Sequence, residues 1–170
     1  PPVRNFALEF GERRADFHEA GGILRALRLL ESLGDVHGWA GLARDNGVAT
    51  LLGCAGALPV GPRRVDLVMA SQLVHHLTPE ATVEFLAAVN QVARVGVIVA
   101  DLRRSVLALA GFWVGARLFR FDKATRADGI TSVRRGFSQA ELAQLLARAG
   151  VSASVVRTPG FRLVASWKVA

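Results

Sequence analysis

Two short apolar runs decide the fold: Val65-Asp66-Leu67-Val68-Met69-Ala70 and Val95-Gly96-Val97-Ile98-Val99-Ala100. Both have the length and the largely apolar, β-branched character of buried strands. Between them, Thr78-Pro79-Glu80 is typical of a helix start, with Thr as N-cap, Pro at the first position and an acid in the first turn. Strand, helix and strand in this order form a βαβ unit. The segment 65–100 therefore predicts an α/β protein with a parallel sheet.

The chain beyond Ala100 continues the alternation. Asp101 is placed to cap a helix that extends to Phe119, and a polar loop over 121–136 follows. Ser138 and Glu141 then form a capping box that opens another helix. Two helices separated by this loop are thus predicted before the chain returns to the sheet.

The last two predicted strands, 153–157 and 161–168, are joined by Thr158-Pro159-Gly160. This turn is short enough to make the two strands antiparallel neighbours. We predict a single Rossmann-like sheet of seven strands, mostly parallel, with the last strand antiparallel and inserted beside the fifth.

The first sixty residues carry weaker signals. A strand is predicted over 7–11, and a helix over 23–33 from the spacing of its leucines. Two further strands are predicted over 36–42 and 48–52. No repeat or linker marks a second domain, so the chain is expected to form one domain over 1–170.

The composition excludes several classes of protein. Apolar residues make up 51% of the 170 residues, which excludes a disordered tail. Cys54 is the single cysteine, so neither a disulfide framework nor a cysteine-rich zinc site is expected. The run 106–119 is too short to span a bilayer, and the opening residues lack the apolar block of a signal peptide. We expect a cytoplasmic protein without stable membrane insertion.

The net charge of +7 raises the question of nucleic-acid binding. Almost all of the basic residues are Arg, and they are scattered along the chain in doublets such as Arg13-Arg14 and Arg134-Arg135. Nucleic-acid binders concentrate their charge on one face and interleave it with aromatic residues. We therefore expect a small-molecule partner and no nucleic acid.

An ordered set of motifs runs through the C-terminal part of the chain. It starts with Ser71-Gln72-Leu73-Val74-His75-His76-Leu77, continues with Asp101-Leu102-Arg103-Arg104 and Ala127-Asp128-Gly129, and ends with Gly160-Phe161-Arg162-Leu163-Val164. Together these motifs resemble the C-terminal two-thirds of small bacterial class I, S-adenosylmethionine-dependent methyltransferases, the group that includes ubiquinone-biosynthesis enzymes. The resemblance implies an acceptor half over 61–170 and a cofactor half over 1–60.

The cofactor half matches less well. Gly53-Cys54-Ala55 resembles a turn in which an acid, replaced here by Cys54, contacts the adenine amino group. Ala43 stands where a second acid would hold the ribose hydroxyls, and Asp45 lies two residues further on. The resemblance implies S-adenosylmethionine as the cofactor, with these residues as its contacts: Gly11, Gly21, Gly22, Asp45, Cys54, Ala55, Ser71 and Gln72.

Two glycine segments are alternative candidates for the glycine-rich first loop of such a site. Gly21 and Gly22 directly precede the predicted helix 23–33, whose N-terminus would face the polar tail of the cofactor. Alternatively, Gly11 belongs to that loop. Only 30 residues separate Gly22 from Gly53, which leaves little room for two strands and two helices. The front half is therefore compressed, truncated or altered.

His75 and His76 are the candidate catalytic residues, because they follow a predicted strand at the edge where open α/β sheets place their ligands. Either ring is suited to act as a general base on a substrate hydroxyl or to line the pocket; local packing and hydrogen bonding are the alternatives. No carboxylate or cysteine has ligand-like spacing to them, so no metal is expected. Asp101 either faces the substrate or caps the next helix, and we favour the cap.

The helix over 106–119 is the candidate lid over the acceptor, with plain core packing as the alternative. Phe112 and Trp113 should border the pocket, because this helix starts at a strand's carboxyl end. Arg135 is suited to hold an anionic substrate group, or is a solvated charge.

The sequence predicts a methyltransferase acting on a small apolar or aromatic acceptor. Two alternatives stay open. One is a catalytically inactive relative that serves as a binding or scaffold module, which the replaced acids favour. The other is a peripheral lipid-binding protein that uses the apolar helix 106–119 and its flanking arginines.

Overall fold

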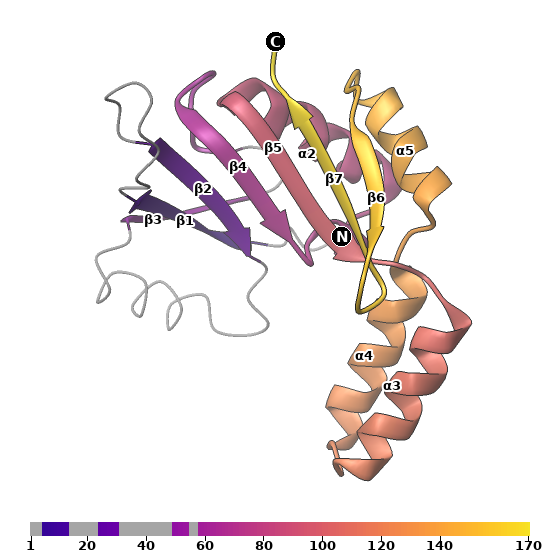
Figure 1. Cartoon of the computed structure of the whole chain (residues 1–170). Coiled ribbons are helices and arrows are strands. Elements are labelled where there is room, and N and C mark those ends of the chain that lie inside the picture. The colour runs from indigo at the N-terminus through magenta and orange to yellow at the C-terminus, as the bar shows by residue number, and fades with distance from the viewer. Residues whose placement is uncertain (1–4, 14–23, 31–48, 55–57) are drawn as a thin grey trace.

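The computed structural model describes residues 5–13, 24–30, 49–54 and 58–170. Seven strands form one sheet in the order β3-β1-β2-β4-β5-β7-β6 (Figure 1). The strands are β1 (Asn5–Arg13), β2 (Leu24–Leu30), β3 (Ala49–Cys54), β4 (Val65–Ser71), β5 (Ala93–Leu102), β6 (Ser154–Thr158) and β7 (Arg162–Lys168). The predicted single seven-stranded sheet is confirmed.

Five of these strands run in one direction. The β2–β4 and β4–β5 pairs are parallel, whereas β7 is antiparallel to both β5 and β6. The insertion of the antiparallel last strand beside the fifth is therefore confirmed. β1 is a second antiparallel strand, paired with β2 on one side and β3 on the other, and the sequence did not predict its direction.

The helix predicted over 23–33 is wrong, because Leu24–Leu30 forms strand β2. This run is seven residues long, and a short leucine-rich segment fits a buried strand as well as a helix. Pairing with β1 and β4 engages its backbone on both sides and decides between the two. The strands predicted over 7–11 and 48–52 correspond to β1 and β3, and the segment 36–42 lies outside the described residues.

Two helices, α2 (Pro79–Val92) and α5 (Gln139–Arg148), pack side by side against the sheet (Figure 1). Both helices begin after the N-cap residues that the sequence predicts. The Thr78 hydroxyl accepts a hydrogen bond from the Ala81 backbone N–H, and Ser138 and Glu141 complete the capping box.

The hydrophobic core lies between these helices and the C-terminal part of the sheet. The strands contribute apolar residues on one face, and the helices contribute the stripes that cover them. Its largest fully buried side chains are Phe85, Leu73, Leu86, Leu142, Leu146, Leu163, Val65, Val68 and Val74.

A second pair of helices, α3 (Val106–Leu118) and α4 (Lys123–Arg135), forms a hairpin that projects away from the sheet (Figure 1). The loop predicted over 121–136 is therefore mostly helix. Helix α4 has an N-cap, because the Asp122 carboxylate accepts hydrogen bonds from the backbone N–H groups of Ala124 and Thr125. None of the α4 residues is buried, so no apolar stripe marked this helix in the sequence.

The two ends of the hairpin are held together at its base. The Phe137 N–H donates to the Leu102 carbonyl at 3.0 Å, and the Arg104 N–H donates to the Phe137 carbonyl at 3.0 Å. Gly136 makes this approach close: a Cβ atom there would stand 2.8 Å from the Leu102 oxygen. The hairpin thus leaves the sheet and returns to it at one point.

Candidate functional site

The site lies at the carboxyl ends of β4 and β5, where a 3-10 turn, η1 (Val74–His76), follows β4. Asp101, near the end of β5, is 1% exposed and reaches across to this turn. Its Oδ2 accepts the backbone N–H groups of Val74 at 2.8 Å and His75 at 3.3 Å. The carboxylate therefore fixes the loop after one strand to the end of its neighbour.

Asp101 Oδ1 lies 2.6 Å from His75 Nδ1, and both side chains are buried. A carboxylate only accepts hydrogen bonds, so this contact assigns the ring proton of neutral His75 to Nδ1. The lone pair is then on Nε2, the atom that can take a proton from a substrate. A carboxylate that orients an imidazole in this way is a recurring device of general-base sites.

The favoured role of Asp101 as the cap of the next helix is wrong. Ser105 caps α3 instead, accepting a weak 3.5 Å hydrogen bond from the Ala108 N–H. Asp101 also lines neither of the two cavities that the described residues form at this edge. Its four N–H contacts, including Leu102 at 2.6 Å, are all internal, which makes it a positioning residue for η1 and His75.

In the part of the chain that the structure describes, two cavities meet at the histidines. His76 is half-buried, its ring centroid lies 3.9 Å from that of His75, and both residues line both cavities. The first cavity, of about 370 Å³, lies between η1, the end of β5 and the hairpin. Its walls are formed by Gln72, His75, His76, Leu102, Phe112, Asp128, Gly129, Ser132 and Val133.

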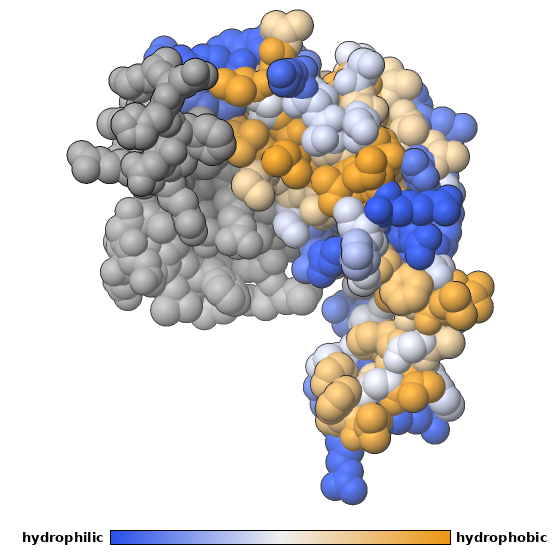
Figure 2. All heavy atoms as spheres, viewed as in Figure 1, coloured by the Kyte–Doolittle hydropathy of each residue, from blue (hydrophilic) through white to orange (hydrophobic). Residues whose placement is uncertain are grey.

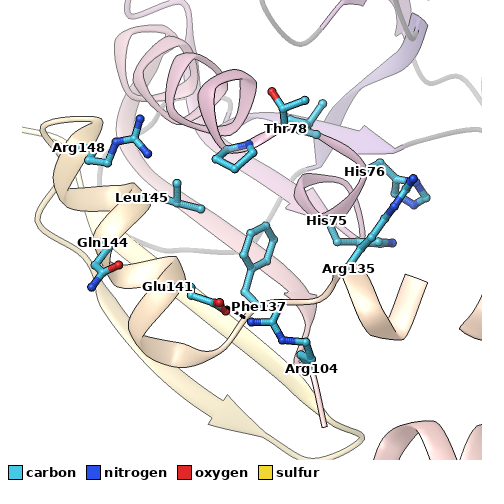
Figure 3. Close-up of a pocket in the computed structure, with 12 residues that line it drawn as sticks. His75, His76, Thr78, Arg104, Arg135, Phe137, Glu141, Gln144, Leu145 and Arg148 are labelled. Atoms are coloured by element: carbon cyan, nitrogen blue, oxygen red, sulfur yellow. Dashed lines mark hydrogen bonds and ion pairs between the residues drawn. The ribbon is translucent and has the colours of Figure 1, made fainter. Parts of the chain in front are cut away.

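The second cavity, of about 530 Å³, lies between η1, the start of α2 and α5. Figure 3 shows side chains of α5 on one side, the two histidines on the other, and Phe137 between them. Arg104 forms an ion pair with Glu141 at its rim. The Ser138 backbone N–H bound to Glu141 holds the pKa of that carboxyl below its ordinary value, and Arg104 adds to the effect. This cavity is rimmed mainly by charged groups.

Of the two aromatic residues predicted to border the pocket, Phe112 and Trp113, only Phe112 does so. Phe112 lines the first cavity, as predicted, and its ring packs against Gly129 of α4. Trp113 does not line this cavity, so the prediction is wrong for that residue. Its side chain borders a recess between α3 and α4, and the Arg117 guanidinium lies over its ring, 4.2 Å from the ring centroid. Adjacent helix residues point about 100° apart, so only one of the two rings faces the site. Arg135 lies on the second cavity.

The predicted cofactor contacts fall into three groups. Ser71 ends β4 and Gln72 follows it at a φ of 53°, with Gln72 on the first cavity. Cys54 ends β3, which runs in the same direction, so Cys54 and Ser71 belong to the same edge of the sheet. Gly11 is paired with Ala26 on the reversed strand β1, toward the opposite edge, so this register does not place it in a loop at the site. Gly21, Gly22, Asp45 and Ala55 lie outside the described residues.

The sequence did not assign roles to several residues of the first cavity, chiefly those of α4. Ala127-Asp128-Gly129 belongs to the ordered motif set and is the signal for this wall, but the sequence predicts a loop where the structure has helix α4. Within the described ranges, no cluster of three or more His, Cys, Asp or Glu side chains is arranged to hold a metal ion.

No protein-family model and no curated protein matches the chain. Its structure is similar to that of a SAM-dependent methyltransferase from Aquifex aeolicus, with a TM-score of 0.57 and 14% identity over 81% of this chain and 65% of that one. A SAM-dependent methyltransferase from Thermotoga maritima gives a TM-score of 0.56 and 19% identity over 79% of this chain and 70% of that one. The chain thus spans about two thirds of the length of these neighbours. It has the Rossmann-like fold of the class I S-adenosylmethionine-dependent methyltransferases.

Proposed function

We propose that this protein transfers a methyl group from S-adenosylmethionine to a small acceptor held in the cavity above the ends of β4 and β5. The observation that carries the proposal is the buried Asp101–His75 pair, in which Asp101 lies behind His75 and His75 lines that cavity. The fold supports it, since open α/β sheets bind their ligands at the carboxyl ends of the strands. The division into a cofactor half over 1–60 and an acceptor half over 61–170 belongs to the same proposal.

In this proposal His75 is the general base. The Asp101 carboxylate keeps the proton on Nδ1, and Nε2 takes the proton of an acceptor hydroxyl or amine as the acceptor is methylated. His76 packs against the His75 ring and lines the pocket. Asp101 holds both the ring and the backbone of η1, so the base is oriented before the acceptor binds.

The acceptor is a small aromatic or apolar molecule with one or two polar groups. Leu102, Phe112 and Val133 supply an apolar wall, and Asp128 and Ser132 supply polar groups. A volume of about 370 Å³ lies at the lower end of the range for small-molecule sites. In a site of this kind, the polar groups orient the acceptor toward the base.

The described end of β4 supports the cofactor part of the proposal. Parallel β2 and β4 end together, with Leu30 opposite Ser71, and Gln72 turns the chain sharply so that its N–H donates to the Ala100 carbonyl at 2.8 Å. In the proposal Ser71 and Gln72 border the cofactor, and Cys54 lies at the adenine end. S-adenosylmethionine supplies an electrophilic methyl group, and the protein's part is to position the two reactants in line.

Calorimetric titration with S-adenosylmethionine tests the cofactor site. Cys54 and Ala43 replace two acids, so the unmodified chain should bind weakly or undetectably. The double variant Ala43→Asp/Cys54→Asp should bind about two to four orders of magnitude more tightly, because two charge-assisted hydrogen bonds are regained. Ala43→Asn/Cys54→Asn is the matched uncharged control.

Micromolar binding by the unmodified chain would overturn the altered-site interpretation and leave the fold assignment standing. If the double variant also fails to bind, the defect lies in the short segment between Gly22 and Gly53. In that case the chain is better described as a binding or scaffold module with a methyltransferase fold.

The base is tested by His75→Asn, whose amide nitrogen can still donate to Asp101 while Nε2 is lost. With S-adenosylmethionine and catechol as a probe acceptor, kcat in the cofactor-binding variant should fall about 10²- to 10⁴-fold. His76→Asn is the matched control and should change kcat less than about tenfold. The opposite ranking would assign the base to His76, and unchanged melting temperatures would show that both variants fold.

A further inference from the structure

The outer face of α3 is apolar and uncovered. Val106 is 83% exposed, Leu107 73% and Leu118 74%, and Phe119 at the end of the helix is 71% exposed. Val106, Ala110, Val114 and Leu118 are spaced four residues apart, so they form one stripe along the helix. We call this stripe, together with Leu107, the outer α3 face; Val106 and Ala110, at its start, also border the recess between α3 and α4. Arg117 flanks this face in the last turn of the helix, where its guanidinium lies over the Trp113 ring.

The inner side of α3 accounts for only part of its apolar character. Ala108 and Ala116 are its buried residues, and Phe112 packs on Gly129 of α4. A helix that is apolar on all sides is normally covered on all sides, in a protein core or by lipid. α4 covers one side, and Figure 2 shows apolar residues gathered on the surface of the projecting hairpin.

The hairpin carries a marked excess of positive charge. From Arg103 to Arg135 there are seven Arg and one Lys, against the two acids Asp122 and Asp128. Several of these cations stand at the far end, where α3 passes into α4: Arg117, Arg120, Lys123 and Arg126. The same end carries exposed aromatic rings, Phe119 and Phe121. Aromatic and basic residues around an apolar helix face are the features of an interfacial membrane helix.

We propose that the α3–α4 hairpin docks on an anionic lipid bilayer, with the outer α3 face immersed at the boundary between headgroups and acyl chains. The 13-residue helix is about 20 Å long, which is too short to span the bilayer, and in this proposal it lies in the plane of the interface. Across the described part of the chain, no helix combines the length and apolar character needed to cross a membrane. The surplus cations select anionic headgroups, whereas the apolar stripe supplies the hydrophobic contact.

The inference is independent of methyl transfer, since it rests only on the surface of the hairpin. It does have a bearing on the site. Phe112 of α3 lines the cavity of about 370 Å³ from the inner side of the same helix. A docked hairpin therefore holds this cavity next to the lipid surface, where apolar molecules are concentrated.

Co-sedimentation of the 170-residue chain with vesicles tests the proposal. We expect binding to vesicles of equimolar phosphatidylglycerol and phosphatidylcholine, and at least about tenfold weaker binding to pure phosphatidylcholine. Leu107→Glu/Leu118→Glu should weaken binding to the anionic vesicles by at least about a further tenfold relative to Ala127→Glu/Thr131→Glu. The second pair adds the same two charges to exposed positions of α4 and leaves the outer α3 face intact.

The charge contribution is tested separately. Arg120→Gln/Arg126→Gln should reduce binding to anionic vesicles by about fivefold per charge and leave binding to neutral vesicles unchanged. Circular dichroism of each variant shows that it folds. Absence of binding, equal binding to both vesicle types, or equal effects of the α3 and α4 glutamate pairs would each overturn the proposal. So would a dimer of the unmodified chain that Leu107→Glu/Leu118→Glu converts to monomers, because the outer α3 face would then bind a second copy.

Discussion

The two helix pairs of this protein use their apolar residues differently. α2 and α5 are amphipathic and bury eight residues between them, including Phe85 and Leu142, against the sheet. α3 is more apolar than either, yet it buries two alanines, and α4 buries none of its residues. One pair holds the fold together, and the other extends from it with its apolar side outward. Apolar content alone therefore does not identify the helices that stabilise this fold.

The largest expected effect that tests this comparison is on stability. Phe85→Ala should lower the free energy of unfolding by about 3–5 kcal/mol, because Phe85 is fully buried and leaves a cavity. Leu118→Ala, on the exposed outer α3 face, should change it by less than about 0.5 kcal/mol. Urea denaturation of both variants gives the comparison. A similar loss from both would show that the outer α3 face is covered in solution.

A smaller effect is expected where the hairpin is tightly packed. A Cβ at Gly129 would stand 2.1 Å from Cζ of Phe112, so Gly129→Ala must displace the ring, at a cost of about 1–3 kcal/mol. Gly111→Ala is the matched control on the outer side of α3, where nothing lies within 4 Å, and it should stabilise by about 0.5–1 kcal/mol. Thermal unfolding separates the two. Equal effects would mean that the two helices do not pack through this contact.

The smallest expected effect concerns the capping box of α5 and depends on pH. The Ser138 N–H, with Arg104, lowers the folded-state pKa of Glu141 below its ordinary value of 4.5. A depressed pKa stabilises the fold above the unfolded-state value, and this stabilisation is lost as the pH falls through the folded-state value. Glu141 is about half exposed, so the loss should be below about 1 kcal/mol.

Urea denaturation from pH 6 down to pH 3 should therefore show a shallower fall in stability for Glu141→Gln than for the unmodified chain. Gln retains a side-chain acceptor for the Ser138 N–H, so only the charge is removed. A parallel curve for the two proteins would show that Glu141 is not linked to folding. Because α5 belongs to the core-forming pair of helices, the difference between the two curves measures how much the Glu141 charge in the capping box contributes to stability.

Prediction from sequence succeeded where local chemistry decides the structure. Thr78 and the Ser138–Glu141 capping box correctly predicted the starts of α2 and α5, and the short turn before β7 predicted the antiparallel pair at the end of the sheet. It failed for β2, because the pairing with β1 and β4 settles a short leucine-rich segment whose own pattern is ambiguous. It also failed for α4, which has a cap but no buried face to create a periodic signal.

The candidate site shows the same division. Since parallel strands end at one edge, His75 and Asp101 could be predicted to lie near each other. Their hydrogen bond joins residues 26 apart in the chain, and no local pattern shows that Asp101 turns toward η1 and not toward α3. The choice between Phe112 and Trp113 depends on how α3 is rotated about its axis, which packing against α4 fixes.

The close approach at the base of the hairpin has a consequence for how this chain could diversify. Leu102 and Phe137, whose backbones are hydrogen-bonded, mark the points where the chain leaves the sheet and returns to it. Everything between them is a module with adjacent ends, and segments of this kind are the ones that proteins exchange, lengthen or delete without disturbing the rest of a domain. One wall of the cavity in which we propose that the acceptor binds, including Phe112 and Gly129, belongs to this module. A change of hairpin would therefore alter both the proposed acceptor site and the proposed membrane-docking surface in a single step.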